Sequence, residues 1–135
     1  MSRNIQKHII PIVLAGFALL LIFTGFSSSS SAQDSNNRGR VLFEKRCGGC
    51  HALDRDKEGP RLGGVYGRTA GAVDSFQYSE ALKKSKIVWA EATLDAWLTD
   101  TEKLVPNNDM TFHVEKPDER REIIAYLKQT SSGSF

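Results

Sequence analysis

Cys47-Gly48-Gly49-Cys50-His51 is the stretch that decides how this chain folds, because it places two thiols and an imidazole within five residues. This is the spacing at which a haem is attached covalently. Each thiol can add to one haem vinyl group, and the adjacent imidazole is then held where its Nε2 can coordinate the iron. The motif therefore predicts a fold built around one haem, with Cys47 and Cys50 as covalent anchors and His51 as an iron ligand.

Three other interpretations of the motif compete with this one. A redox dithiol calls for a βαβ pattern, and the residues before Cys47 look helical instead. A structural zinc needs four ligands, but beyond the leader segment the only other histidine is His113. A plain disulfide leaves the adjacent histidine without a role. The haem interpretation accounts for all three side chains.

The first 32 residues have the organisation of a secretory signal peptide. A basic start precedes an almost continuous apolar core over residues 12–23, and Ser30-Ser31-Ala32 offers small residues for cleavage. The alternative is an uncleaved membrane anchor, because the apolar stretch 9–26 could just span a bilayer. The short core followed by a small-residue site favours cleavage. We therefore expect export to the periplasm, with a membrane tether only if the leader is retained.

Cleavage would leave residues 33–135 as one domain without net charge. Arg3 and Lys7 lie in the leader, so the rest of the 18 basic residues equal the 16 acidic ones in number. A neutral domain gives no electrostatic reason to expect nucleic acid or a membrane surface as a partner. We expect a monomer whose modest core is enlarged by the buried cofactor.

Apolar periodicity predicts a mainly α protein. Helices are expected over residues 37–46, 79–84, 92–99 and 118–129. Glycines at 59, 63, 64, 67 and 71 indicate a long irregular loop. No run of alternating apolar and polar residues predicts a strand.

The second iron ligand is expected to be Met110 rather than His113. Met110 is the only methionine beyond the leader, and His113 is the only histidine there besides His51. Met110 ends a stretch from Val105 whose Pro, Asn and Asp residues disfavour helix and suit a loop that can cover a haem face. His113 follows Phe112 toward the expected surface. We therefore predict that Met110 ligates the iron and that His113 does not.

Further motifs surround the haem motif in a fixed order. Gly39 and Phe43 stand eight and four residues before Cys47. After it come Gly59-Pro60-x-Leu62-x-Gly64-x-x-Gly67-Arg68, Phe76-x-Tyr78, Trp89, Pro106-x-x-x-Met110-x-Phe112 and Ala125-Tyr126-Leu127. From Gly39 to about Lys128 the chain thus resembles class I cytochrome c, in the branch of mitochondrial and related bacterial proteins. The resemblance implies a small fold of helices and loops wrapped around one covalently bound haem c.

The resemblance also implies roles for individual residues. The Pro60 carbonyl is expected to accept the Nδ1–H of His51, which fixes the ring and makes it a better donor to iron. Gly39 and Tyr126 are expected to form the crossing point of the two terminal helices. Three residues are expected to neutralise and hydrogen-bond the haem propionates: Arg68, Tyr78 and Trp89.

Several positions depart from the mitochondrial pattern. Trp97 stands where that branch has a tyrosine beside the methionine ligand, and Asn108 replaces a threonine; both are expected to contact the haem. Leu82 replaces an asparagine and Asp109 replaces a lysine. The segment between His51 and Pro60 is three residues shorter. These changes are expected to leave haem ligation intact, but the family pattern does not carry over the exact redox potential or the docking surface.

The resemblance implies an electron carrier and not an enzyme. Expected partners are redox proteins, such as a quinol:cytochrome c reductase, a terminal oxidase or a dehydrogenase of a respiratory chain. Two alternatives remain: a haem peroxidase or small-ligand sensor with a labile sixth ligand, and a dedicated cytochrome subunit of a dehydrogenase or oxidase. Because the domain is neutral and Asp109 adjoins Met110, docking is expected to use a small apolar contact rimmed by Thr111, Phe112 and His113.

Overall fold

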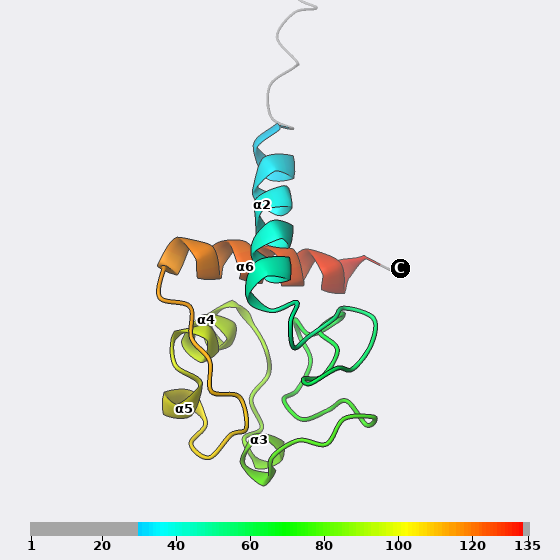
Figure 1. Ribbon diagram of the computed structural model, residues 1–135, viewed down its shortest axis with the longest axis vertical. Coiled ribbons are helices and arrows are strands. Elements are labelled where there is room, and N and C mark those ends of the chain that lie inside the picture. The colour runs from blue at the N-terminus through cyan, green and yellow to red at the C-terminus, as the bar shows by residue number, and fades with distance from the viewer. Residues whose placement is uncertain (1–29, 134–135) are drawn as a thin grey trace, which may run out of the picture. The chain divides into compact units, whose positions relative to one another are not determined.

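A computed structural model describes residues 30–133 of the 135-residue chain, so nearly all of the expected leader lies outside the described residues. The elements are helices α2 (Ser30–Arg46), α3 (Glu80–Lys84), α4 (Glu91–Thr99), α5 (Thr101–Leu104) and α6 (Pro117–Ser132) (Figure 1). Within residues 30–133 the only strand-like pairing is one antiparallel bridge between Thr69 and Val88. The prediction of a mainly α fold is confirmed.

The expected helices are all present, with shifted ends. α2 begins at Ser30 rather than at residue 37, so the expected cleavage point after Ala32 lies within it. The helix α5 was not expected, because a single turn is too short to show apolar periodicity. Its start is capped by the Asp100 carboxylate, which accepts the N–H of Lys103 at 3.0 Å. No helix in the described part of the chain combines the length and apolar character needed to cross a bilayer.

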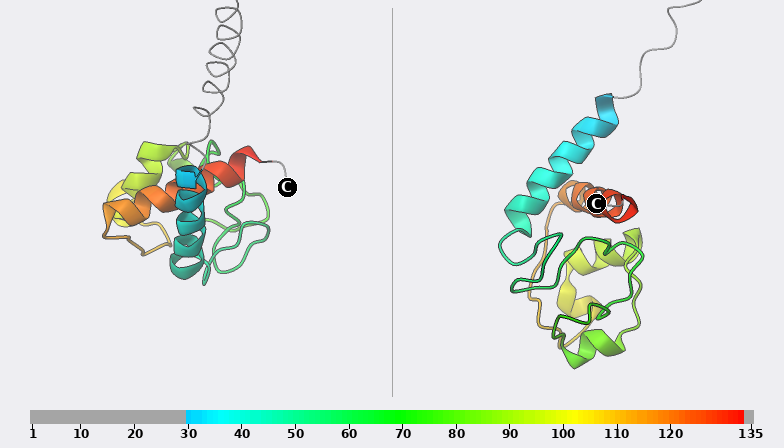
Figure 2. Two further views of the ribbon diagram at one scale, coloured as in Figure 1. Left: turned by 90° about the horizontal axis from the view of Figure 1, so that it is seen from above. Right: turned by 90° about the vertical axis from the view of Figure 1, so that its right-hand side faces the viewer.

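Helices α2 and α6 cross at Gly39, where they lie against each other (Figure 2). A Cβ at this position would lie 2.9 Å from the Cβ of Tyr126 and closer still to the backbone of α6. Only glycine therefore allows this approach. One turn later, the rings of Phe43 and Tyr126 pack with their centroids 5.6 Å apart. The crossing fixes the C-terminal end of α2, and Cys47 follows directly from it.

Helix α6 supplies the centre of the core. Pro117 occupies its first turn, and Asp118 and Glu119 place negative charge there, which the helix dipole favours. The apolar face of α6 packs against that of α4. Together these two faces bury Ile123, Ile124, Leu127, Leu94, Trp97 and Leu98. These side chains form the apolar core between α4 and α6.

The segment between α2 and α3 is irregular but is tied to the chain beyond it by backbone hydrogen bonds. The N–H of Gly67 donates to the carbonyl of Trp89 at 2.7 Å, and the N–H of Trp89 donates to the carbonyl of Arg68 at 2.9 Å. Gly64, Gly67 and Gly71 adopt positive φ angles of 69°, 87° and 73°, which side chains disfavour. The turns bring Arg68 next to Trp89, two sequence-predicted site residues.

Candidate haem site

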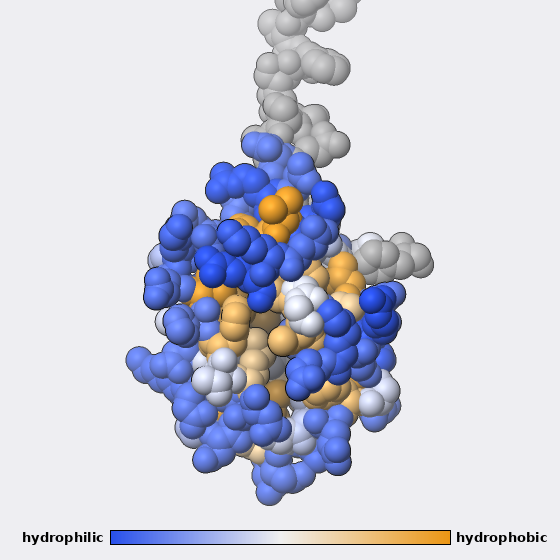
Figure 3. Space-filling model, viewed as in Figure 1, coloured by the Kyte–Doolittle hydropathy of each residue, from blue (hydrophilic) through white to orange (hydrophobic). Residues whose placement is uncertain are grey.

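A cavity of about 370 Å³ opens beside the end of α2, with Met110 on its far side. This volume falls within the ~300–1,000 Å³ typical of cofactor sites. Figure 3 shows a hollow on this face, with apolar residues inside it and hydrophilic residues around it. The apolar walls include Leu62, Val65, Leu82, Leu94, Leu98 and Ile123. Such walls exclude water from a bound group.

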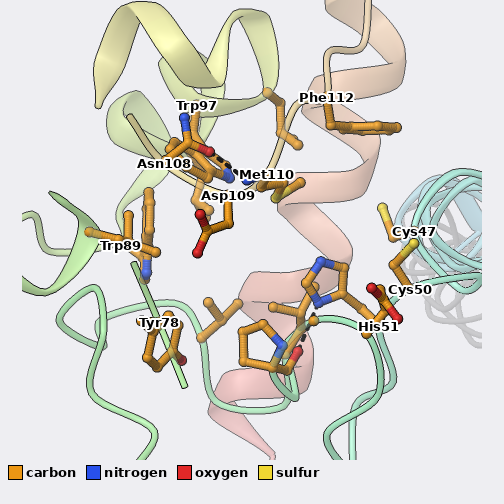
Figure 4. A pocket seen from close by; sticks show the side chains of 18 of the residues that line it. Cys47, Cys50, His51, Tyr78, Trp89, Trp97, Asn108, Asp109, Met110 and Phe112 are labelled. Carbon is orange, nitrogen blue, oxygen red and sulfur yellow. Dashed lines mark hydrogen bonds between the residues drawn. The ribbon is translucent and has the colours of Figure 1, made fainter. Parts of the chain in front are cut away.

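The two cysteines lie together at one edge of the cavity (Figure 4). The N–H of Cys47 donates to the carbonyl of Phe43 at 2.8 Å, and the N–H of His51 donates to the carbonyl of Cys47 at 2.8 Å. The chain therefore continues in a tight turn past α2. Both cysteines are free thiols, and burial raises the pKa of Cys47 to about 11. Both thiols are thus available at the edge where a porphyrin substituent would lie.

The imidazole of His51 is held from behind so that one nitrogen faces the cavity. Its Nδ1 lies 2.8 Å from the carbonyl oxygen of Pro60, and because a carbonyl only accepts, the proton belongs on Nδ1. The lone pair of Nε2 is left free on the side of Met110 (Figure 4). Burial lowers the pKa of His51 and favours the neutral ring that binds metals. A Cβ at Gly59 would lie 2.6 Å from Nδ1, so glycine makes room for the ring.

Met110 faces His51 across the cavity (Figure 4). Its N–H donates to Oδ1 of Asn108 at 2.7 Å, and its carbonyl accepts a hydrogen bond from the hydroxyl of Thr101. Backbone contacts on both sides of the residue therefore orient its side chain. The side chain of His113 is 65% exposed, 4.0 Å from Glu115, and does not line the cavity. Of the two expected distal candidates, only Met110 lies in the site.

The end of the cavity away from the cysteines carries Tyr78 and Trp89, with Arg68 also in its lining (Figure 4). The guanidinium of Arg68 is half-buried and donates to the carbonyl of Arg61 at 2.8 Å. Burial lowers the pKa of Arg68 and raises the pKa of Tyr78. Trp89 and Trp97 are only 7% and 6% exposed, yet neither indole N–H meets an acceptor within residues 30–133.

These features fit a haem. An unpaired buried donor costs roughly 1–3 kcal/mol, so the indole N–H groups call for an acceptor on a bound molecule. A cation and donors at one end suit carboxylates, while the thiols at the other end suit vinyl groups. Across the cavity, His51 and Met110 offer a nitrogen and a thioether. In the described residues no three His, Cys, Asp or Glu side chains cluster as a metal site.

Sequence reasoning located the lining of the cavity but missed the residues that support it. Thr101 and Glu102 on α5 hydrogen-bond the loop that carries Met110, and no motif marks them. Arg120 was also missed: it is buried on α6 and donates to Asp95 at 2.7 Å and to the carbonyl of Val114 at 2.9 Å. Arg120 lies on the same face of α6 as the buried apolar residues, and this position in the sequence could have indicated its burial.

The chain matches the sequence profile of the family Cytochrome c over residues 37–131. It is 40% identical over 99 residues to cytochrome c of Chlamydomonas reinhardtii, covering 70% of this chain and 88% of the relative. With cytochrome c of Euglena viridis it shares 43% identity over 94 residues, covering 67% and 92% of the two chains.

A solved structure shares the fold. Cytochrome cH from Methylobacterium extorquens superimposes with a TM-score of 0.66 at 38% sequence identity. The match covers 70% of this chain and 97% of that chain. The family profile, which begins at residue 37, includes every residue that lines the cavity.

Proposed function

Because the chain belongs to the cytochrome c family, and is therefore a single-haem electron carrier with a covalent haem c, we propose that the cavity described above is its haem site. In this proposal Cys47 and Cys50 would hold the haem through two thioether bonds, and His51 and Met110 would ligate its iron. The observation that carries it is the placement of His51 and Met110 on opposite sides of one apolar cavity.

When bound, the haem supplies an iron that cycles between Fe(II) and Fe(III). The protein's part is to hold the ligands still. Pro60 keeps the proton on Nδ1 of His51 and orients the ring, while Asn108 and Thr101 hold the backbone of Met110. Since the protein fixes both ligands before and after transfer, little has to rearrange. With His51 and Met110 both holding the iron, no ligand position would be left for a substrate.

Residues at the other end of the cavity would stabilise the haem carboxylates. Arg68 offers a positive charge, and the N–H of Trp89 lacks an acceptor within the described part of the chain. The aromatic pair formed by Trp89 and Trp97, with ring centroids 5.4 Å apart, keeps both indoles rigid. Tyr78 would add a hydroxyl. A thioether ligand and apolar walls both favour the less charged Fe(II) haem, so we expect a positive potential.

The optical spectrum of the purified holoprotein tests this assignment. A carrier with both axial positions filled gives a six-coordinate, low-spin ferric spectrum with a weak sulfur-to-iron charge-transfer band. A high-spin ferric spectrum would contradict the proposal and favour a peroxidase or a small-ligand sensor. Co-purification with one dehydrogenase or oxidase would identify a dedicated subunit instead of a free shuttle.

The proposal extends to the leader. Residues 1–32 would direct export to the periplasm and be removed, leaving residues 33–135 as the cytochrome domain. Supporting this, Ala32–Phe135 form one compact unit and the family match begins only at residue 37. Partners would be redox proteins of a respiratory chain. N-terminal sequencing of the exported protein tests the boundary: a first residue near 33 supports cleavage, and a retained Met1 contradicts it.

A further inference from the structure

The loop that carries Met110 is fastened to α5 by a carboxylate outside the cavity. Oε1 of Glu102 accepts the backbone N–H of Asn107 at 2.9 Å. Oε2 of the same carboxylate accepts from Nδ2 of Asn108 at 3.3 Å. One side chain on α5 therefore holds two consecutive residues of the loop, three and two positions before Met110.

The hydrogen bonds of Asn108 extend this fastening to Met110 itself. Nδ2 of Asn108 also donates to the carbonyl of Val105 at 2.9 Å, so its amide nitrogen is surrounded by acceptors. Its Oδ1 must then point the other way, where it accepts the N–H of Met110 at 2.7 Å. The carboxylate of Glu102 thus favours the orientation of the Asn108 amide in which Oδ1, and not Nδ2, faces the N–H of Met110.

The backbone of Asn107 also needs the contact with Glu102. Its φ is 63°, a left-handed conformation that glycine adopts readily and other residues rarely adopt. Asparagine tolerates it better than most residues, but the loop still needs a contact that retains it. The hydrogen bond from the Asn107 N–H to Glu102 is such a contact, and the carboxylate charge strengthens it.

Helix α5 is a suitable platform for holding the loop. Asp100 caps its start, and Thr101 donates from its hydroxyl to the carbonyl of Met110. Thr101 is buried and Glu102 is exposed, so neighbouring residues hold the loop from the inside and from the outside. Thr101 contacts Met110 directly, whereas Glu102 acts two residues earlier.

We propose that Glu102 is a positioning residue for iron ligation, whose carboxylate keeps the loop 105–110 in the conformation that presents Met110 to the haem. This inference rests on the proposed function, in which Met110 is the distal ligand. A glutamine cannot replace the carboxylate, because its NH₂ group would face the N–H of Asn107 or the NH₂ of Asn108, donor against donor.

The test is the binding of imidazole to the ferric holoprotein, which requires Met110 to leave the iron. We expect Glu102→Gln to increase the apparent association constant for imidazole about tenfold or more, the effect of losing one hydrogen bond to a charged group. The matched control is Glu91→Gln, which removes the same charge from an exposed side chain on α4 that has no hydrogen-bond or ion-pair partner in residues 30–133. The control should stay within about twofold of wild type. Equal affinities in the two variants would overturn the proposal.

A second measurement needs no variant. In the wild-type ferric holoprotein, the amide of Asn107 should exchange its hydrogen with solvent far more slowly than an unstructured amide, although the residue is exposed. Exchange at the unprotected rate would overturn the role of Glu102. The proposed function fails separately, by the absence of the sulfur-to-iron charge-transfer band in wild type.

Discussion

At the scale of single residues, the position of the His51 ring depends on the absence of a side chain at Gly59. The carbonyl of Pro60 orients the imidazole, and the missing side chain of Gly59 gives the ring its space. A glycine is required here by close approach rather than by backbone conformation, since its φ is not positive. Gly59 and the carbonyl of Pro60 therefore both set the position of the His51 ring.

We predict that Gly59→Ala displaces the His51 ring and weakens the fold. The added Cβ would lie 2.6 Å from Nδ1 and 2.8 Å from Nε2, so the ring or the loop must move. Overpacking of this kind costs roughly 1–3 kcal/mol in the free energy of unfolding, measured by guanidinium denaturation of the ferric holoprotein. The control is Gly49→Ala, where a Cβ meets nothing within 4 Å. Equal stabilities of the two variants would contradict the account.

The proposed haem-binding residues were accessible from sequence, and the residues that support them were not. Cys47, Cys50 and His51 share one local motif, and Met110 follows by elimination from a chain poor in methionine. Glu102 acts through hydrogen bonds to a loop without repeating geometry, so neither spacing nor periodicity reveals it. Local chemistry is visible in a sequence, whereas partners across an irregular loop depend on the fold.

At the scale of elements, the crossing of α2 and α6 fixes where the haem motif begins. The helices meet at Gly39 and are joined near the end of α2 by Arg46, which donates to Glu119 at 2.7 Å. The resemblance located this crossing, and the apolar face of α6 predicted its burial. The extension of α2 back to Ser30 was not predicted, because residues 30–36 carry no apolar stripe.

We predict that Gly39→Ala destabilises the holoprotein even though alanine favours helix by about 1 kcal/mol. The new Cβ would overlap the backbone of α6 near Glu122, and two rigid helices must separate to admit it. A net loss of about 1–3 kcal/mol in the free energy of unfolding is expected. Val41→Ala, on the exposed side of the same helix, should change stability by far less. An increase in stability on Gly39→Ala would mean that the helices do not cross there.

The short segment between His51 and Pro60 is fastened by Asp56. Its carboxylate accepts from the hydroxyl of Ser75 at 2.6 Å and from the N–H of Arg61 at 2.8 Å. The Ser75 bond is the larger cause that lowers the pKa of Asp56 below its ordinary 3.8. This contact therefore joins the haem-motif side of the cavity to the chain before α3.

We predict that Asp56 contributes stability that is lost in acid. Because its folded pKa lies below 3.8, the contribution is complete well above pH 3.8 and disappears as the pH falls through the folded value. Asp56→Asn should lower the free energy of unfolding at pH 7, and the difference from wild type should shrink below about pH 4. Unfolding curves over this pH range check it. A difference that stays constant with pH would contradict the role of the carboxylate charge.

At the scale of the whole molecule, the charges at the cavity mouth do not form a basic ring. Arg46 lines the cavity but is paired with Glu119, and the exposed residues Glu58 and Asp109 line it as well. Thr111 and Phe112 line the cavity, and His113 lies outside its lining. The mouth of the cavity therefore combines apolar side chains with a few charged groups of both signs.

We predict that electron exchange with the physiological oxidase or reductase is only weakly guided by charge. Steering between oppositely charged faces raises association rates but is screened by salt. The second-order rate constant should therefore fall by less than about tenfold between low and physiological ionic strength. Stopped-flow kinetics across a salt series measures it. A steeper fall would reveal strong steering and contradict the account of the surface.

The ligation of the iron by His51 and Met110 is most directly tested by redox titration of Met110→Ala beside His113→Ala, each followed by ferric absorption. Met110 lies in the cavity, and the side chain of His113 is 65% exposed outside it. We predict that Met110→Ala abolishes the sulfur-to-iron charge-transfer band and lowers the reduction potential, while His113→Ala changes neither. If His113→Ala shifts the potential and Met110→Ala leaves the spectrum intact, the carrier has two histidine ligands and the account is wrong.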